Sequence, residues 1–491
     1  MRMRPQDSKV FTLSRNILSI LDKEAVRFHT CIDLPERIIQ LTAAETSKSH
    51  GKLGLPGAVA SNMLSMIGVG PFLSIPLALI AMHGSCVLLP WMLGALIALC
   101  DGLVWAELGS LMPRSGGPYF YLREAFGPNS AGRVGSFLIL WSTVLTAPLI
   151  IASGAVGFAQ YLHFLWPRLD GVGLTLVAMA VCLVNVFLLY RRISVIGSIS
   201  LLLWGLVVGT ILWIIAGGGL HIFSAFREQA VSGHALIHGN FWKGVGAATL
   251  IAMYDYAGYY NVCLLGGEVR RAERTIPRSI LISILLVALL YIAMNFSILG
   301  VLHPQASMRS TAIVADFMQS VYNAQCARIA AALVLVAAFA SVFAILLGSS
   351  RIPFAAAQRG EFFRIFARTH PTKHFPYASL LILGGLSACA CLLSLNTLIT
   401  LVIAIQTIVQ FLAQCVAVVL LRRRGTPANR HVFRMPFYPL PVAVAFAGWL
   451  FVLLSSGLRN VLAAVLVTLA GVAAFYYQKR QYPQLPLGSY E

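Results

Sequence analysis

Charged residues are scarce in this chain of 491 residues: they make up 11% of it, whereas hydrophobic residues make up 58%. In soluble globular domains about 25% of residues are charged, and the mean hydropathy of +0.80 lies outside their range. So few charges do not cover the surface of a soluble fold of this size. The composition therefore predicts a protein that is solvated by a lipid bilayer.

Acidic residues are scarcer than basic ones: the chain has 17 Asp and Glu and 36 Lys and Arg, which gives a formal net charge of +19. In a soluble protein this excess would suggest a nucleic acid partner. Here 30 of the 36 basic residues fall in the two tails and in alternate loops, and only 6 fall in the remaining loops. This pattern places the basic loops in the cytosol. We therefore expect both termini to be cytosolic, anionic lipid headgroups to be partners, and nucleic acid not to be one.

Signals for several other classes of protein are missing. The first 50 residues contain no apolar core and no cleavage site, so we expect a cytosolic tail rather than a signal peptide. The nine cysteines are scattered singly, without a CxxC pair or a metal-ligand cluster, so the sequence predicts neither a metal nor another cofactor. No HExxH, GxSxG, paired mid-span aspartates or repeated pore loop occurs, which argues against an enzyme and against a channel.

Long apolar runs are abundant, and each has the ~20 residues that cross a hydrocarbon core. Because backbone polar groups in hydrocarbon must bond within their own segment, the runs are expected to be helices and the fold class all-α. We divide the chain into a cytosolic tail over 1–50, a core of ten spans over 51–425, two further spans over 426–478 and a cytosolic tail over 479–491. The predicted protein is an integral, multi-pass protein of a plasma or bacterial inner membrane. Its twelve spans centre near Ile67, Leu96, Leu145, Val181, Leu206, Met253, Leu286, Leu335, Leu383, Ile408, Ala445 and Leu466.

Two spans contain residues that an ordinary lipid-facing helix avoids. The first has glycines and a proline at mid-span depth over residues 67–72, and the sixth has a carboxylate, a glycine and four tyrosines over residues 254–261. Gly70 and Gly258 are 188 residues apart, and five spans separate the starts of the two segments. Interrupted helices at matching places indicate two inverted five-helix repeats, as in secondary transporters, with two peripheral helices added.

A broken helix exposes N–H groups where its second half begins and C=O groups where its first half ends. The N–H groups around 69–71 suit the carboxylate of an amino acid, and the carbonyls of Ile67, Tyr256 and Ala257 suit its ammonium group. Close helix packing is the other interpretation of the first-span glycines, and the paired break in the sixth span favours a site. The candidate substrate-binding residues are Ile67, Gly68, Val69, Gly70, Tyr254, Asp255, Tyr256, Ala257 and Gly258.

Asp255 is predicted near the middle of the sixth span, where an ionised carboxylate costs at least ~2.5 kcal/mol. It is expected to bind a substrate amine, to take up a coupling proton, or to be held neutral by neighbouring hydroxyls. Tyr254, beside the break, is the tyrosine that we expect at the site.

Other polar positions give weaker signals. Glu107 is expected to brace a cytosolic loop, and Glu268 is expected to form an ion pair with Arg270 or Arg271. For three glutamines of the tenth span, Gln406, Gln410 and Gln414, hydrogen bonds between helices are favoured over substrate contact. The candidates for coupling or gating are Asp255, Tyr260, Glu107 and Glu268.

Three segments together resemble the amino acid-polyamine-organocation superfamily of permeases. They are the first-span break over 67–72, the stretch Ala106 to Gly109 with Pro113, Ser115 to Gly117 and Tyr119 to Leu122, and the run Gly267 to Val269 with Arg274 to Arg278. The resemblance implies a ten-helix core of two inverted repeats, alternating access, and substrate held by the unwound first and sixth spans. It implies amino acids as substrates, with polyamines or other organic cations as the alternative. It leaves proton coupling, sodium coupling and exchange open, and the oligomeric state is not predicted.

Overall fold

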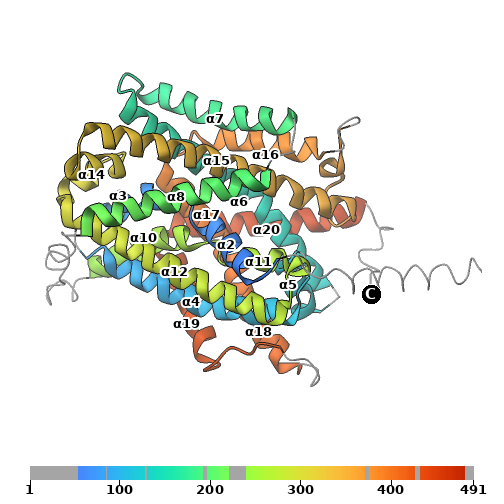
Figure 1. Ribbon diagram of the computed structural model, residues 1–491. Coiled ribbons are helices and arrows are strands. Elements are labelled where there is room, and N and C mark those ends of the chain that lie inside the picture. The colour runs from blue at the N-terminus through green and yellow to red at the C-terminus, as the bar shows by residue number, and fades with distance from the viewer. Residues whose placement is uncertain are drawn as a thin grey trace, which may run out of the picture. The chain divides into compact units, whose positions relative to one another are not determined.

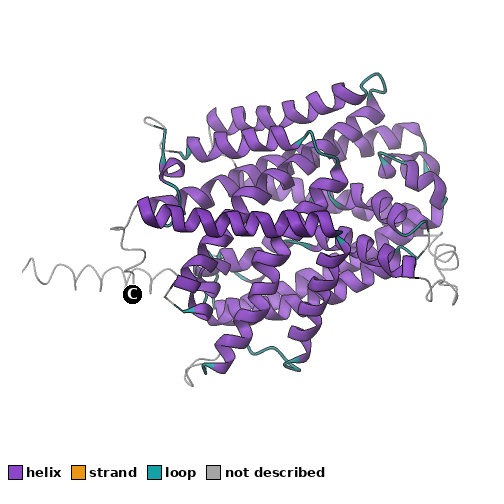
Figure 2. Cartoon of the chain, turned by 180° about the vertical axis from the view of Figure 1, so that it is seen from behind, coloured by secondary structure: helices purple, strands orange, loops and turns teal. Residues whose placement is uncertain are grey.

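The computed structural model describes residues 53–84, 86–114, 116–127, 130–191, 196–219, 239–370, 375–425 and 432–481. Within these ranges every regular element is a helix (Figures 1 and 2), and the one extended pairing is a bridge between Leu53 and Val269. The all-α fold class is therefore confirmed. The predicted tail over 1–50 and most of the tail over 479–491 lie outside the described residues.

Long apolar helices make up most of the described chain. Seven are long and apolar enough to cross a membrane, or eight when a sharply bent pair is counted as one span. The seven are α4 (Leu88–Leu111), α6 (Ser130–Leu165), α7 (Gly171–Arg191), α12 (Ala272–Val301), α15 (Ala324–Gln358), α17 continued through α18 (Leu395–Arg423), and α20 (Leu458–Gln481). Shorter apolar helices include α8 (Ile196–Gly218), α16 (Tyr377–Ala390) and α19 (Leu440–Ser455). The chain is thus a multi-pass membrane protein, and the count of twelve spans stays a prediction.

The first predicted span is broken where its sequence requires. Helix α2 (Leu55–Met66) and helix α3 (Pro71–Ala81) meet at an angle of 51° across residues 67–70. Pro71 has no N–H to continue a hydrogen-bonded ladder, and its fixed φ suits the first turn of a new helix. The predicted first break is therefore confirmed.

The sixth predicted span is also broken, although its second half is much shorter than a half-span. Helix α10 (Gly239–Tyr256) ends before Gly258, whose φ of +118° favours glycine. A single turn, α11 (Asn261–Leu264), and the 3₁₀ turn η3 (Gly266–Glu268) follow. The break is confirmed, but the region after it is a compact turn.

Segments that occupy matching places in the predicted repeats pack in pairs. Helix α2 contacts α11, and α3 contacts α10, so that each half of one broken helix lies against the opposite half of the other. Helix α4 packs along α12, α6 along α15, and α7 along α16. The α7–α16 pair lies at the top of Figure 1 and the α4–α12 pair near its base. In each of these pairs, a helix of the first predicted repeat therefore packs against the helix at the same place in the second repeat.

The buried apolar side chains form two main clusters. One joins the broken helices to α4, α8, α12, α14 (Ile313–Val321) and α19, and the other joins α6, α7, α15 and α16. The short helices α5 (Pro118–Phe126) and α13 (Pro304–Arg309) and the 3₁₀ turn η4 (Arg364–Ala367) connect the long ones. Both broken helices belong to the first cluster, which places their interruptions inside protein rather than against lipid.

The tenth predicted span is not one continuous α-helix. Helix α17 (Leu395–Gln406) passes through a π-turn, Thr407–Phe411, into α18 (Leu412–Arg423). Gln410 and Gln414 are buried here. The Gln410 side chain interacts with the Tyr260 hydroxyl of the sixth span, whereas the Gln414 amide has no hydrogen-bond partner among the described residues. The predicted hydrogen bond between helices is therefore wrong for Gln414.

Candidate functional site

The two breaks lie directly against each other. A side chain at Gly258 would meet the backbone of Ser65 in the last turn of α2, at 2.7 Å from its carbonyl carbon. A side chain at Gly70 would meet the Asp255 carboxylate in the last turn of α10. The two glycines thus let the interrupted segments touch.

The beginning of α3 has unused donors. The N–H of Phe72 is bonded to the carbonyl of Val69 at 3.1 Å, and Pro71 has no N–H. Within the described residues, the N–H groups of Val69 and Gly70 have no acceptor. Because the N-terminus of a helix carries partial positive charge, these two groups suit an anion.

The beginning of α11 is bonded to side chains of α2. The N–H of Val262 donates to the side-chain oxygen of Asn62 on α2 at 2.8 Å, and the Asn62 amide donates to Ser283 on α12. The Asn261 amide donates to the hydroxyl of Ser61 at 3.0 Å. The first half of the first span thus caps Val262, although the N–H groups of Tyr259 and Tyr260 just before α11 have no acceptor among the described residues either.

The carbonyl ends of the two breaks differ in their partners. The hydroxyl of Tyr291 on α12 lies 3.0 Å from the carbonyl of Met66 and 3.4 Å from that of Asp255. By contrast, the described residues include no donor to the three predicted carbonyls, those of Ile67, Tyr256 and Ala257. These carbonyls suit an ammonium group.

Asp255 is buried, with 2% of its surface exposed, and it sits beside the open end of α3. Neither of its carboxylate oxygens has a hydrogen-bond partner among the described residues. The Ser74 hydroxyl on α3 faces it without forming a hydrogen bond of ordinary geometry. An unpartnered buried carboxylate is expensive and is usually kept for function.

The four tyrosines of the sixth span point in different directions. The Tyr254 hydroxyl lies 2.5 Å from that of Ser153 on α6, beside the break. Tyr256 donates to the carbonyl of Trp91 on α4, and Tyr260 stacks on Trp105. The Tyr254 ring therefore lies beside Gly70 of the first break, and the side chain of Tyr256 packs against α4.

Asp101 on α4 is a second fully buried carboxylate, and it is not one of the predicted site residues. The Tyr259 hydroxyl donates to it at 2.5 Å, and the Cys415 thiol lies 4.0 Å from its other oxygen. Its place in the middle of an apolar run was an available signal, because mid-span carboxylates are rare. The hydrogen bond between Tyr259 and Asp101 links the sixth break to α4.

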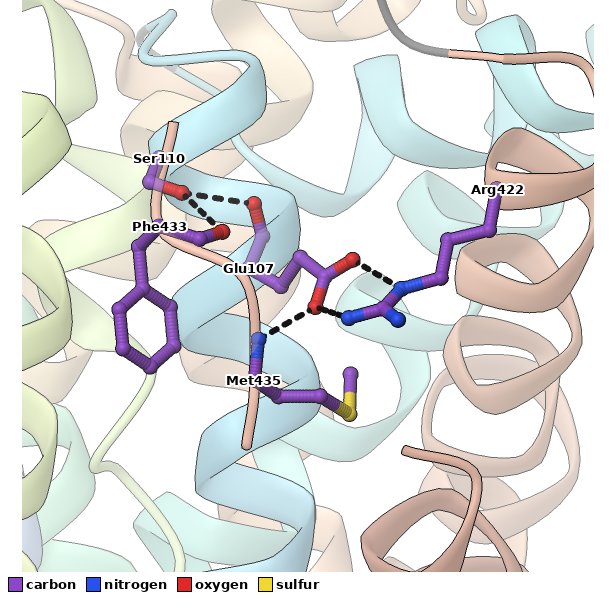
Figure 3. A network of polar contacts seen from close by, with 5 residues as sticks. All are labelled: Glu107, Ser110, Arg422, Phe433 and Met435. Carbon is purple, nitrogen blue, oxygen red and sulfur yellow. Dashed lines mark hydrogen bonds and ion pairs between the residues drawn. The ribbon is translucent and has the colours of Figure 1, made fainter. Parts of the chain in front are cut away.

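Glu107 joins three segments at one end of α4 (Figure 3). Its carboxylate accepts two hydrogen bonds of 2.5 Å from Arg422 on α18 and one of 2.8 Å from the N–H of Met435. The Ser110 hydroxyl on the same helix reaches the carbonyl of Phe433. The carboxylate thus braces a loop, as the sequence predicted.

Glu268 does not form the ion pair that the sequence predicted. Its side chain is exposed in η3, and among the described residues it has no basic partner, although Arg270 and Arg271 follow closely. Its main-chain carbonyl accepts a hydrogen bond from the N–H of Leu53 at 3.1 Å. A backbone hydrogen bond, rather than an ion pair, therefore holds Glu268 against the start of α2.

Long apolar helices and two mutually packed mid-helix breaks define a multi-pass membrane transporter, a class that binds small polar solutes where helices unwind. Residues 53–481 match the amino acid permease family, and the chain belongs to that family, within the amino acid-polyamine-organocation superfamily. The members of this family are transporters and not enzymes.

The chain is similar to transporters over most of their length. The chain is 26% identical to the serine/threonine exchanger SteT of Bacillus subtilis, over 88% of this chain and 97% of that protein. It is 27% identical to the human Asc-type amino acid transporter 1, over 88% and 83% of the two chains. It is 30% identical to an uncharacterized transporter of Mycobacterium tuberculosis, over 69% and 72%.

Proposed function

We propose that this protein is a secondary carrier of amino acids that works by alternating access, with substrate bound between the breaks of the first and sixth spans. The observation that carries the proposal is the pair of unbonded N–H groups of Val69 and Gly70, at the end of α3 where the Asp255 carboxylate also lies. A substrate carboxylate bonds there, and its ammonium group bonds to the carbonyls of Ile67 and Ala257. Both charges of a zwitterion are then matched by exposed backbone.

The pairing of the long helices supports two inverted repeats. Each of α4, α6 and α7 packs against the helix that holds the same place in the other predicted repeat. A pseudo-two-fold axis brings matching helices together in this way, and rocking of one set against the other exposes a central site to each side in turn. Twelve spans with both termini in the cytosol complete this arrangement.

Transport of an organic cation is the alternative, and the unpartnered Asp255 carboxylate is the observation that favours it. An amine that lacks a carboxylate gains from this charge and loses nothing at α3. The names of the SteT exchanger and of the Asc-type transporter state that they carry amino acids, and this supports the first proposal.

Uptake into proteoliposomes tests the two proposals. Purified protein is reconstituted, and labelled alanine, serine, leucine, lysine and putrescine are supplied in turn. Saturable uptake of one or more of the amino acids, with putrescine excluded, is the result that we expect. Uptake of putrescine alone would establish the cation carrier, and no uptake of any amino acid would contradict the proposed function.

A further inference from the structure

The carboxylate of Asp255 occupies the place where a substrate carboxylate is expected. Its oxygen lies where a side chain on Gly70 would be, and Gly70 is the residue before the first turn of α3. The free N–H groups of Val69 and Gly70 belong to the same end. A substrate bound at these groups therefore has its own carboxylate next to that of Asp255.

Two carboxylates in contact inside protein do not both stay ionised, because each disfavours the charged form of its neighbour. At a separation of ~4 Å and an effective dielectric constant of ~20, the repulsion weakens binding by on the order of a thousandfold. Paired carboxyl groups in proteins commonly share one proton instead.

No positive side chain relieves this repulsion in the described part of the chain. The titratable groups that interact with Asp255 are the phenols of Tyr254 and Tyr256 on its own helix and of Tyr291 on α12. From α3 it faces the Ser74 hydroxyl. Helices α4, α17 and α19 also pack against α10, and none of them contributes a charged group that acts on Asp255.

The other buried carboxylate nearby is already engaged. Asp101 on α4 accepts a hydrogen bond from Tyr259, on the far side of the sixth break. It is also not among the groups that act on Asp255.

We propose that Asp255 binds the proton that enters with each amino acid; this inference rests on the proposed function. One proton from the outer solution converts the carboxylate to a carboxylic acid, whose O–H donates a hydrogen bond to the substrate carboxylate. When the substrate leaves on the inner side, the O–H bond breaks and the proton is released there. Each neutral amino acid thus carries one positive charge inward.

Proteoliposomes that contain the full chain test this coupling, with labelled alanine as the probe and the membrane potential clamped. For the wild type, we expect an inward proton gradient to concentrate alanine roughly tenfold per pH unit, the ratio that one coupled proton supplies. The nearly isosteric Asp255→Asn variant should equilibrate alanine without responding to the gradient. The matched control is Asp170→Asn, which removes an exposed carboxylate between α6 and α7 and should behave as the wild type.

Proton uptake in detergent gives a second measurement that needs no vesicles. Alanine binding in weak buffer should take up about one proton per wild-type molecule and none per Asp255→Asn molecule. The inference is overturned if wild-type uptake ignores the proton gradient or if Asp255→Asn still responds to it. It is also overturned if a monodisperse Asp255→Asn variant no longer binds alanine, because the carboxylate then serves the ammonium group. If the wild type takes up no amino acid at all, the proposed function itself fails.

Discussion

Gly70 is the residue at which the proposed site leaves least room for change. We predict that Gly70→Ala raises the half-saturation concentration for amino acid uptake by roughly tenfold or more. The added methyl group would collide with the Asp255 carboxylate and displace it from the end of α3. The substrate carboxylate would then lose its hydrogen bond from the protonated Asp255 side chain. Loss of one hydrogen bond to a charged group costs about 1.5–3 kcal/mol, which corresponds to a tenfold or larger change in affinity.

The matched control for this variant is Gly385→Ala on α16, where an added methyl group meets nothing within 4 Å. Its uptake should equal that of the wild type. Equal half-saturation concentrations for Gly70→Ala and Gly385→Ala would show that Gly70 lies outside the site.

Glu107 is a structural residue by its contacts, and this interpretation is also testable. Glu107→Gln should lower the unfolding temperature of the purified protein, because it leaves Arg422 without its ionic partner and breaking such a buried pair costs about 3 kcal/mol. The weaker pair of Arg123 and Glu361, at 3.7 Å, offers the comparison Glu361→Gln, which should cost less. If Glu107→Gln keeps its unfolding temperature but alters the pH dependence of uptake, Glu107 is a coupling group.

Single residues could be predicted from the sequence where the signal is local. The glycines, Pro71 and Asp255 stand out because they are unusual within an apolar run. The capping of Val262 by Asn62 and the bonds of Tyr291 to the breaks could not be predicted, because they join residues 200 and 225 positions apart. The spacing of residues in a sequence does not predict which distant group a buried Asn or Tyr will bond.

At the scale of elements, the asymmetry between the two breaks is the main finding. The N–H groups of Val69 and Gly70 before α3 have no acceptor in the described part of the chain, whereas the N–H of Val262 in α11 is bonded to Asn62 on α2. The sequence predicted both breaks from glycine and proline at mid-span depth. It did not predict that only the short turns α11 and η3 would follow the sixth break, because the length of this region depends on how it packs against α2.

The cap on α11 leads to a prediction about local stability. Asn62→Ala should speed amide hydrogen exchange over residues 261–264, because the N–H of Val262 then loses its acceptor, at a cost of about 1–3 kcal/mol. Asn62→Asp keeps an acceptor oxygen and should exchange more slowly than Asn62→Ala. Exchange by both variants at the wild-type rate would mean that the cap does not hold this turn.

At the scale of the whole molecule, the fold class and the membrane character could be predicted from the sequence more fully than the contacts of single residues. Hydropathy and charge distribution are summed over hundreds of residues, and they indicated a multi-pass all-α membrane protein whose family match covers residues 53–481. The pairing of α4 with α12, α6 with α15 and α7 with α16 follows the predicted repeats. Which faces meet in each pair depends on side-chain shape, and composition does not encode it.

We propose that an amino acid binds with its carboxylate at the open end of α3. A structure of the purified protein with bound substrate is the most direct test. We predict a substrate carboxylate within hydrogen-bond distance of the N–H groups of Val69 and Gly70, beside the Asp255 side chain. A substrate carboxylate bound elsewhere, with those two N–H groups still unbonded, would contradict the account.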